Sequence, residues 1–267
     1  MKFIAARDAI LTPLQAVAGV VEKRQTMPVL GNVLLICKDD LLTITATDLE
    51  VELSATSAIQ ITDAGEITVP GRKLLDIVKA LPEKSEIVFS LESERVIIRS
   101  GKSRFTLTTL PAADFPSTEN IEIKQKISVA QSDLKVLLEK THFSMAQQDV
   151  RYYLNGLLFE FADKQMRLVA TDGHRLALAE MKLKESVTTS IQVILPRKGV
   201  LELQRILSAQ ANVELSLGSN HMRVNVGGIR FTSKLIDGRF PDYSRVIPVN
   251  PTRVVETSPA VVRLALQ

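Results

Sequence analysis

The chain has 267 residues, of which 45% are hydrophobic and 24% are charged, and its formal net charge at pH 7 is +3. This composition is ordinary for a globular protein, and the length predicts about two domains of roughly 100–200 residues each. The single cysteine, Cys37, excludes a disulfide framework and a cysteine metal site, and so small a net charge does not by itself indicate nucleic-acid binding.

The N-terminal residues and the hydropathy pattern indicate a cytoplasmic protein. Residues 1–8 carry charges too early and too often for a signal peptide, and no stretch of about 18 apolar residues predicts a membrane span. A lone thiol fits a reducing compartment. Cys37 lies in an apolar run, Val33 to Cys37, and is expected to fill a position in a buried strand.

In chain order, the predicted elements alternate between helices and short strands. Apolar residues at helical spacing predict a helix over 7–21, in which Pro13 disturbs the first turn. A strand is predicted over 41–46, and a second helix over 71–81 follows Pro70, a favourable residue at a helix start. Further strands with hairpin spacing are predicted over 86–91, 95–99 and 104–108.

The second half of the chain repeats this order. Helices are predicted over 131–143 and 197–207, Ala46-Thr47-Asp48 returns 124 residues later, and Arg104-Phe105-Thr106 returns 126 residues later. A nearly constant offset indicates two copies of one domain. We expect α+β domains of two helices packed on antiparallel sheets, over 1–124 and 125–250, with 251–267 as the start of a truncated third copy.

Known catalytic patterns are missing from the sequence. Gly101-Lys102-Ser103 resembles the end of a phosphate-binding loop, but the glycine required at position 96 is Val96, so we interpret the segment as a hairpin turn. His142, His174 and His221 lack metal-ligand spacing. We therefore expect no enzyme activity, no catalytic residue, no metal and no cofactor.

One polar segment differs between the two copies. Asp172 beside His174 suggests an acid–base pair, yet Asp172 recurs as Asp48, and a residue present in both copies more simply serves the fold. Aspartate after a strand favours a turn. His174 and Arg175 have no counterpart in the first copy, so they are either solvated turn residues or part of a site that only the second copy carries.

Positive residues cluster near the predicted helix starts. The pairs are Lys23-Arg24, Arg72-Lys73 and Arg197-Lys198, and the last two occupy nearly corresponding places in the repeat. Domains arranged in an arc would place them on one concave face, where they could contact phosphates without regard to sequence. Residues able to join such contacts follow the first helix of the second copy: Gln148, Arg151, Tyr152 and Tyr153. The alternative is a set of ordinary solvated charges and a partly buried tyrosine pair.

Several long strings together resemble the family of the bacterial DNA polymerase III beta subunit, the beta sliding clamp. The resemblance runs from residue 1 to about 257, and its most specific strings are Thr109 to Pro116, Asp149 to Gly156, Ala170 to Leu176, Pro196 to Val200 and Asp237 to Tyr243. It implies a non-catalytic processivity factor, whose three-domain chains pair head to tail into a homodimeric ring around duplex DNA and tether the polymerase.

The resemblance also implies partners and site residues. The partners are duplex DNA, the polymerase III catalytic subunit, the clamp loader, other polymerases and repair proteins, and a second copy, all at the nucleoid in the cytoplasm. DNA-binding positions are Arg24, Arg72, Gln148, Tyr152, Tyr153, Arg197 and Lys198. The partner-peptide groove is formed by Leu154, Thr171, Gly173, His174, Arg175, Leu176, Pro241, Arg245 and Val246. The ring interface is formed by Lys73, Leu81, Phe105 and Leu107.

The family's third domain, which supplies the rest of the groove and of the ring interface, is expected to be missing beyond its first residues. This leaves an alternative, in which the chain is a decoy that binds clamp partners without encircling DNA. An enzyme with a site around Asp172 and His174 is disfavoured, since no nucleophile or cofactor motif accompanies them.

Overall fold

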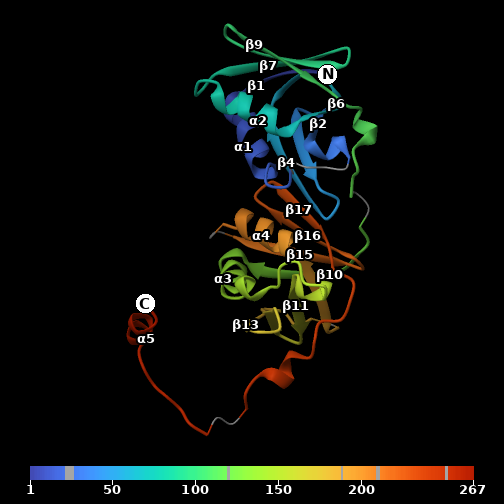
Figure 1. The fold of residues 1–267 in the computed structure, drawn as a ribbon. Coiled ribbons are helices and arrows are strands. Elements are labelled where there is room, and N and C mark those ends of the chain that lie inside the picture. Colours follow the sequence, from blue (N-terminus) through green and yellow to red (C-terminus); the bar gives the residue numbers. More distant parts are fainter. Residues whose placement is uncertain (22–26, 119–120, 188, 209–210, 250–251) are drawn as a thin grey trace.

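The computed structural model describes residues 1–267 except 22–26, 119–120, 188, 209–210 and 250–251. Figure 1 shows two units, one above the other, and a C-terminal segment that leads away from them. The first unit contains β1 (Lys2–Ala6), α1 (Arg7–Val17), β2 (Asn32–Lys38), β3 (Leu41–Thr47), β4 (Val51–Ala58), β5 (Gln60–Asp63), β6 (Gly65–Pro70), α2 (Gly71–Ala80), β7 (Glu86–Glu92), β8 (Arg95–Ser100) and β9 (Ser103–Thr108).

The second unit has the same order, except that no strand corresponding to β5 is present among its described residues. It contains β10 (Ile123–Ala130), α3 (Gln131–Thr141), β11 (Gly156–Ala162), β12 (Gln165–Thr171), β13 (Leu176–Lys182), β14 (Ile191–Pro196), α4 (Arg197–Ile206), β15 (Asn212–Gly218), β16 (His221–Val226) and β17 (Ile229–Lys234). A last helix, α5 (Pro259–Ala265), follows, and residues 252–267 are all exposed.

The predicted helices are present, with small differences at their ends. The first helix ends at Val17 rather than at residue 21, because Val20 and Val21 donate to the carbonyls of Val17 and Ala18 in tight turns. Pro13 lies inside this helix and is buried with Leu14. The third predicted helix ends at Thr141 instead of 143, where a 3-10 turn over His142–Ser144 begins.

Three antiparallel sheets carry the fold. Their strand orders are β5-β1-β7-β8-β9, β10-β15-β16-β17-β4-β3-β2-β6 and β13-β12-β11-β14. The eight-stranded sheet crosses from one unit to the other, because β17 pairs with β4 along Phe231↔Leu53. Figure 1 shows α2, α1, α4 and α3, from top to bottom, along one side of these sheets. The α+β fold of helices on antiparallel sheets is thus confirmed.

The sequence repeat is also a repeat of strand pairing. Leu42 lies opposite Ser57 in the first unit, and Met166 lies opposite Met181 in the second, both 124 residues later. In the same way the β8–β9 register recurs 126 residues later in the pairing of β16 with β17. Equivalent strands therefore follow directly from these offsets: β13 corresponds to β4, and β17 corresponds to β9.

Candidate peptide groove and nucleic-acid surface

A cavity of about 360 Å³ lies in the second unit, between the turn that joins β12 to β13 and the segment after β17. Eight of the nine predicted groove residues line it: Leu154, Thr171, Gly173, His174, Arg175, Leu176, Pro241 and Val246. Arg245 does not line it, and its 83% exposed side chain instead pairs with Asp242 at 2.9 Å. Residues about 90 positions apart in the sequence thus meet at one cavity.

The floor of the cavity is a small apolar core of its own. Leu158, Val169, Ile194 and Phe240 are buried together with Leu154, which is 2% exposed. Tyr153, Leu176 and Tyr243 pack against this cluster from the edge. An apolar floor with a few polar groups at its rim is the usual arrangement of a site for a small molecule or a short peptide.

The turn at the rim is built on Asp172. Its Oδ1 accepts hydrogen bonds from the backbone N–H groups of His174 and Arg175 at 2.9 and 3.0 Å, and its Oδ2 pairs with the Arg175 guanidinium at 2.9 Å. These backbone hydrogen bonds, followed by the Arg175 side chain, lower the pKa of Asp172 to about 2. Asp48 makes the same two backbone bonds in the first unit, to Glu50 and Val51, so the structural role expected for this aspartate is confirmed.

His174 and Arg175 are exposed at the rim. The Arg175 guanidinium carbon lies 5.9 Å from the ring centre of Phe143, a cation–π geometry that favours this position of the side chain. The first unit folds the same turn without these two side chains, so the turn itself does not require them.

Three residues of the cavity were not predicted as groove residues: Asp242, Tyr243 and Arg151, which the sequence suggested only as a possible phosphate contact. The Tyr243 hydroxyl donates to Glu160 on β11 at 3.1 Å and so anchors the outer wall of the groove to the sheet. Burial, followed by the Glu160 carboxylate, raises the pKa of Tyr243. Asp242 and Tyr243 stand within a string that carried the family resemblance, which was the available signal.

Among the expected DNA-binding residues, Arg72 lies at the start of α2 and Arg197 and Lys198 lie at the start of α4, and these three have protein partners. Arg24 lies outside the described residues. Arg72 donates to the Val21 carbonyl at 2.8 Å, and Arg197 donates to the Met145 carbonyl at 3.4 Å. Lys198 contacts the Asp48 carboxylate of the other unit. Gln148 and Tyr152 are exposed, whereas Tyr153 is half-buried.

The expected ring-interface residues divide into two groups. Lys73 is exposed on α2, and Phe105 is half-buried on β9, which is an end strand of its sheet. Leu81 and Leu107 are each only 6% exposed and belong to the core of the first unit. Their side chains therefore lie beneath the surface at which the interface is expected.

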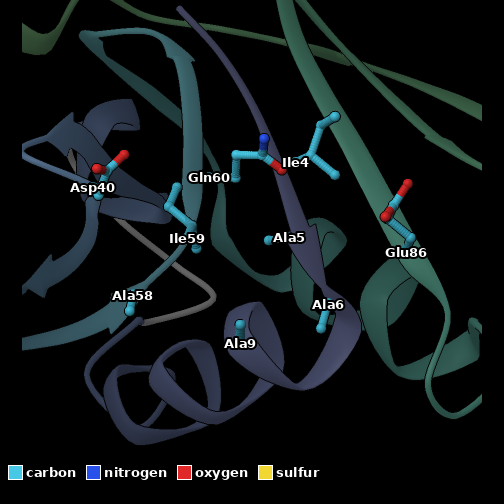
Figure 2. Close-up of a pocket in the computed structure, with 9 residues that line it drawn as sticks. All are labelled: Ile4, Ala5, Ala6, Ala9, Asp40, Ala58, Ile59, Gln60 and Glu86. Carbon is cyan, nitrogen blue, oxygen red and sulfur yellow. The ribbon is translucent and has the colours of Figure 1, made fainter.

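A larger hollow, of about 590 Å³, lies in the first unit between β1, the start of α1 and the segment that joins β4 to β5 (Figure 2). Its lining is mostly small and apolar, as Ala5, Ala6 and Ala9 show, while Asp40 and Glu86 stand on opposite sides. None of the predicted site residues lines it, and we assign it no function.

Among the described residues, no three His, Cys, Asp or Glu side chains gather in a metal-binding arrangement. The helices in this part of the chain are too short or too polar to span a membrane.

Comparison with known proteins identifies the family. Residues 1–122 match the N-terminal domain of the DNA polymerase III beta subunit, and residues 128–242 match its central domain. The beta sliding clamps of Proteus mirabilis and Escherichia coli K12 are 50% and 51% identical over 258 residues, which cover 96% of this chain and 70% of theirs.

Solved structures agree with this assignment. The beta clamp of Pseudomonas aeruginosa bound to griselimycin has a TM-score of 0.90 at 50% identity, covering 94% of this chain and 69% of that one. Pol III beta from Caulobacter crescentus has a TM-score of 0.89 at 41% identity, covering 94% and 70%. The chain therefore belongs to the family of the bacterial DNA polymerase III beta subunit, the beta sliding clamp.

Proposed function

We propose that this chain is a non-catalytic processivity factor that surrounds duplex DNA with its helical side and tethers the replicative polymerase through the groove beside the Asp172 turn. The observation that carries the proposal is the convergence of eight predicted groove residues on one cavity. The partners proposed for the groove are short peptide segments of the polymerase III catalytic subunit, the clamp loader, other DNA polymerases and repair proteins, all acting at the chromosome.

The chemistry of the groove supports a peptide partner. Its floor, formed around Leu154 and Leu176, offers apolar area for one or two large side chains. Its rim offers the Arg175 guanidinium and the exposed His174 side chain for polar groups of the peptide. Tethering through such a site raises the effective concentration of the polymerase at the DNA, so the polymerase rebinds before it diffuses away.

The helical side supports sequence-independent DNA contact. Arg72, Lys73 and Arg197 lie at the starts of α2 and α4, which occupy equivalent places in the two units. Cationic side chains there meet phosphates, which carry no sequence information. Such contacts suit a protein that slides, because no base pair holds it in place.

The strand pairing between the units supports closure into a ring. β17 of the second unit pairs with β4 of the first, and the repeat makes β9 equivalent to β17 and β13 equivalent to β4. β9 and β13 are end strands of their sheets among the described residues. Each edge therefore suits a further repeat in the same way. We propose repeats over 1–124 and 125–250, with 251–267 as the start of a third.

Binding of griselimycin tests the groove, since a clamp that is 50% identical to this chain was solved with this compound. We expect the wild-type chain to bind it by calorimetry, and His174→Ala and Pro241→Ala to weaken binding by about ten-fold or more. Gln60→Ala, in the hollow of Figure 2, is the control and should bind as wild type does. Equal affinity of all four proteins would place the binding site elsewhere. No observation favours the alternative of a partner-binding decoy.

A further inference from the structure

The ion pair between Asp149 and Arg151 lies in a short loop, residues 148–155, that borders the groove beside the Asp172 turn. Arg151 Nε and Nη2 lie 3.0 and 2.8 Å from the two Asp149 carboxylate oxygens, a two-point contact that fixes the plane of the guanidinium. The Arg151 backbone N–H also donates to Asp149 Oδ1 at 2.8 Å. The guanidinium is therefore aimed by the loop itself.

The Arg151 guanidinium contacts the Asp172 turn, which forms the rim of the groove. Arg151 Nη2 donates to the Asp172 carbonyl at 3.3 Å. At Gly173, whose φ is +88°, an added Cβ would lie only 3.1 Å from both terminal nitrogens of Arg151. The missing side chain at Gly173 thus leaves the space that Arg151 occupies.

The next residue of the loop touches the opposite wall. Tyr152 packs on Gly238, where an added Cβ would lie 3.3 Å from its ring, and Pro241 of the groove follows three residues later. Tyr152 is also 58% exposed and is one of the side chains proposed to contact DNA. A single loop therefore contacts the groove rim at Gly173 and, at Gly238, the segment that leads to Pro241, and it carries a side chain that is proposed to contact DNA.

The loop is closed on itself by two hydrogen bonds between Asp149 and Asn155. The Asp149 N–H donates to the Asn155 side-chain oxygen at 2.9 Å, and the Asn155 amide donates back to the Asp149 carbonyl at 2.8 Å. Gln148, before this ring of hydrogen bonds, has a φ of +58°, a conformation that a residue with a side chain seldom adopts. Ligands on either side of the loop would stabilise the same strained arrangement.

We infer that the Asp149–Arg151 pair couples the groove to the DNA-facing loop, so that a groove ligand and duplex DNA each strengthen the binding of the other. This inference rests on the proposed function, because it needs both ligands. Arg151 touches the groove directly, and Asp149, which lines no part of it, is the positioning residue. Reciprocity is required, since the coupling free energy between two sites is the same in both directions.

Fluorine NMR follows the coupling with few signals, because the chain has only three tyrosines, Tyr152, Tyr153 and Tyr243. With 3-fluorotyrosine in all three, the Tyr243 signal reports groove occupancy and the Tyr152 signal reports the loop. We expect griselimycin to shift both signals in the wild type. In Asp149→Asn, which keeps an acceptor for the Arg151 N–H but loses the charge pair, the Tyr243 signal should still shift while the Tyr152 signal no longer follows.

Glu214→Gln is the matched control, since it removes one exposed carboxylate from another ion pair, with Lys126, outside the groove lining. It should behave as wild type does. A Tyr152 signal that stays still in the wild type while Tyr243 shifts would overturn the coupling and leave the groove intact. An equal Tyr152 shift in Asp149→Asn would overturn the role of the ion pair. No shift of any signal would overturn the groove, and the inference with it.

The coupling free energy is measured from the affinity for griselimycin with and without a saturating short DNA duplex at low salt. We expect the duplex to tighten griselimycin binding by about five-fold in the wild type and in Glu214→Gln. In Asp149→Asn the duplex should leave the affinity unchanged. Equal affinities with and without duplex in the wild type would overturn the coupling. A duplex that does not bind would overturn the DNA contact on which the coupling depends.

Discussion

At the scale of single residues, the turn at Asp172 shows how one local structure supports two different uses. Asp48 and Asp172 each accept two backbone N–H groups and close the same turn in the two units. The residue directly after the aspartate is Leu49 in the first unit, with φ +78°, and Gly173 in the second unit, with φ +88°. Glycine removes both the backbone strain and the side chain, and this admits Arg151.

The Asp172 carboxylate should remain ionised far below neutral pH. A lowered pKa means that the ionised form favours the folded turn, so its contribution is complete above the ordinary value of 3.8 and is lost as the pH falls through about 2. A carboxyl-carbon NMR titration should therefore place the Asp172 midpoint near 2. A midpoint near 3.8 would show that the turn hydrogen bonds do not form in solution.

Replacing this side chain should affect the groove in proportion to the hydrogen bonds lost. Asp172→Asn keeps an oxygen acceptor for the two backbone N–H groups but loses the charge that holds Arg175, whereas Asp172→Ala loses both. We expect Asp172→Ala to weaken griselimycin binding by about ten-fold or more, and Asp172→Asn to weaken it less. Calorimetry of the two variants decides this, and equal losses would mean that the turn hydrogen bonds are unimportant.

Cys37 should be unreactive in the folded chain. Its side chain is 1% exposed on β2, as the sequence predicts for a strand position, and burial raises the pKa of its thiol to about 12. Because the thiolate is the reactive form, iodoacetamide should modify the native protein very slowly at pH 8 and the urea-unfolded protein readily. Mass spectrometry is unambiguous here, since Cys37 is the only cysteine. Rapid modification of the native form would contradict the burial.

At the scale of elements, the groove depends on a segment without regular strand or helix structure. The outer wall runs from Leu235 to the 3-10 turn at Tyr243–Val246, and its backbone is attached to β14 by the Ile236 N–H, which donates to the Ile194 carbonyl at 2.9 Å. A further attachment is the hydrogen bond from the Tyr243 hydroxyl to Glu160. Such a wall keeps its position only through contacts with the sheet beneath it.

Tyr243→Phe should therefore weaken the attachment of the outer wall to the sheet while the aromatic ring still lines the groove. It removes the hydrogen bond to Glu160 and keeps the ring, so we expect a loss of about 1 kcal/mol in the free energy of unfolding and a modest loss in griselimycin affinity. Tyr152→Phe is the control for stability, because Tyr152 is 58% exposed and its hydroxyl has no hydrogen bond to another described residue. Urea unfolding of the two variants gives the comparison, and an equal effect would refute the role of the Tyr243–Glu160 bond.

At the scale of the whole molecule, the two units are joined by more than the shared sheet. The Thr118 N–H donates to Glu52 Oε2 at 3.0 Å, and its carbonyl accepts from Arg223 at 2.7 Å, so both units hold the connecting segment. Lys198 contacts Asp48 across the same junction. These contacts fix the relation of the two helical surfaces that would face the DNA.

Glu52→Ala should weaken this junction. Glu52 is 4% exposed, and its loss leaves the Thr118 N–H without its carboxylate partner, which costs about 1–3 kcal/mol. We expect a lower urea midpoint and a broader transition as the units begin to unfold separately. Glu50→Ala, two residues earlier and exposed, should unfold as the wild type does. An unchanged transition in Glu52→Ala would show that the shared sheet alone joins the units.

Sedimentation equilibrium tests closure of the ring. If β9 of one copy pairs with β13 of the next as β17 pairs with β4, a ring of six repeats needs three chains of 29.4 kDa each, and we expect that mass over a range of concentrations. The β17–β4 register pairs Ile229 with Ala55, and the equivalent residues on β9 and β13 are Ser103 and Ala179. The double variant Ser103→Cys with Ala179→Cys should therefore form a disulfide between copies. A monomer without cross-linking would show that copies of this chain do not close a ring by themselves.

The sequence by itself determined the α+β fold, the repeat and the starts of α2 and α4. These features follow from periodicity and from Pro70 and Pro196, which act on their neighbours along the chain. The family resemblance also supplied eight residues of the cavity.

Only the tertiary structure decided how distant segments meet. It placed Arg151 on Gly173, Tyr243 on Glu160 and Lys198 on Asp48, and it buried Leu81 and Leu107 in the core. Such contacts depend on how sheets and loops pack, and a single side chain carries no local signal of which distant partner it will reach.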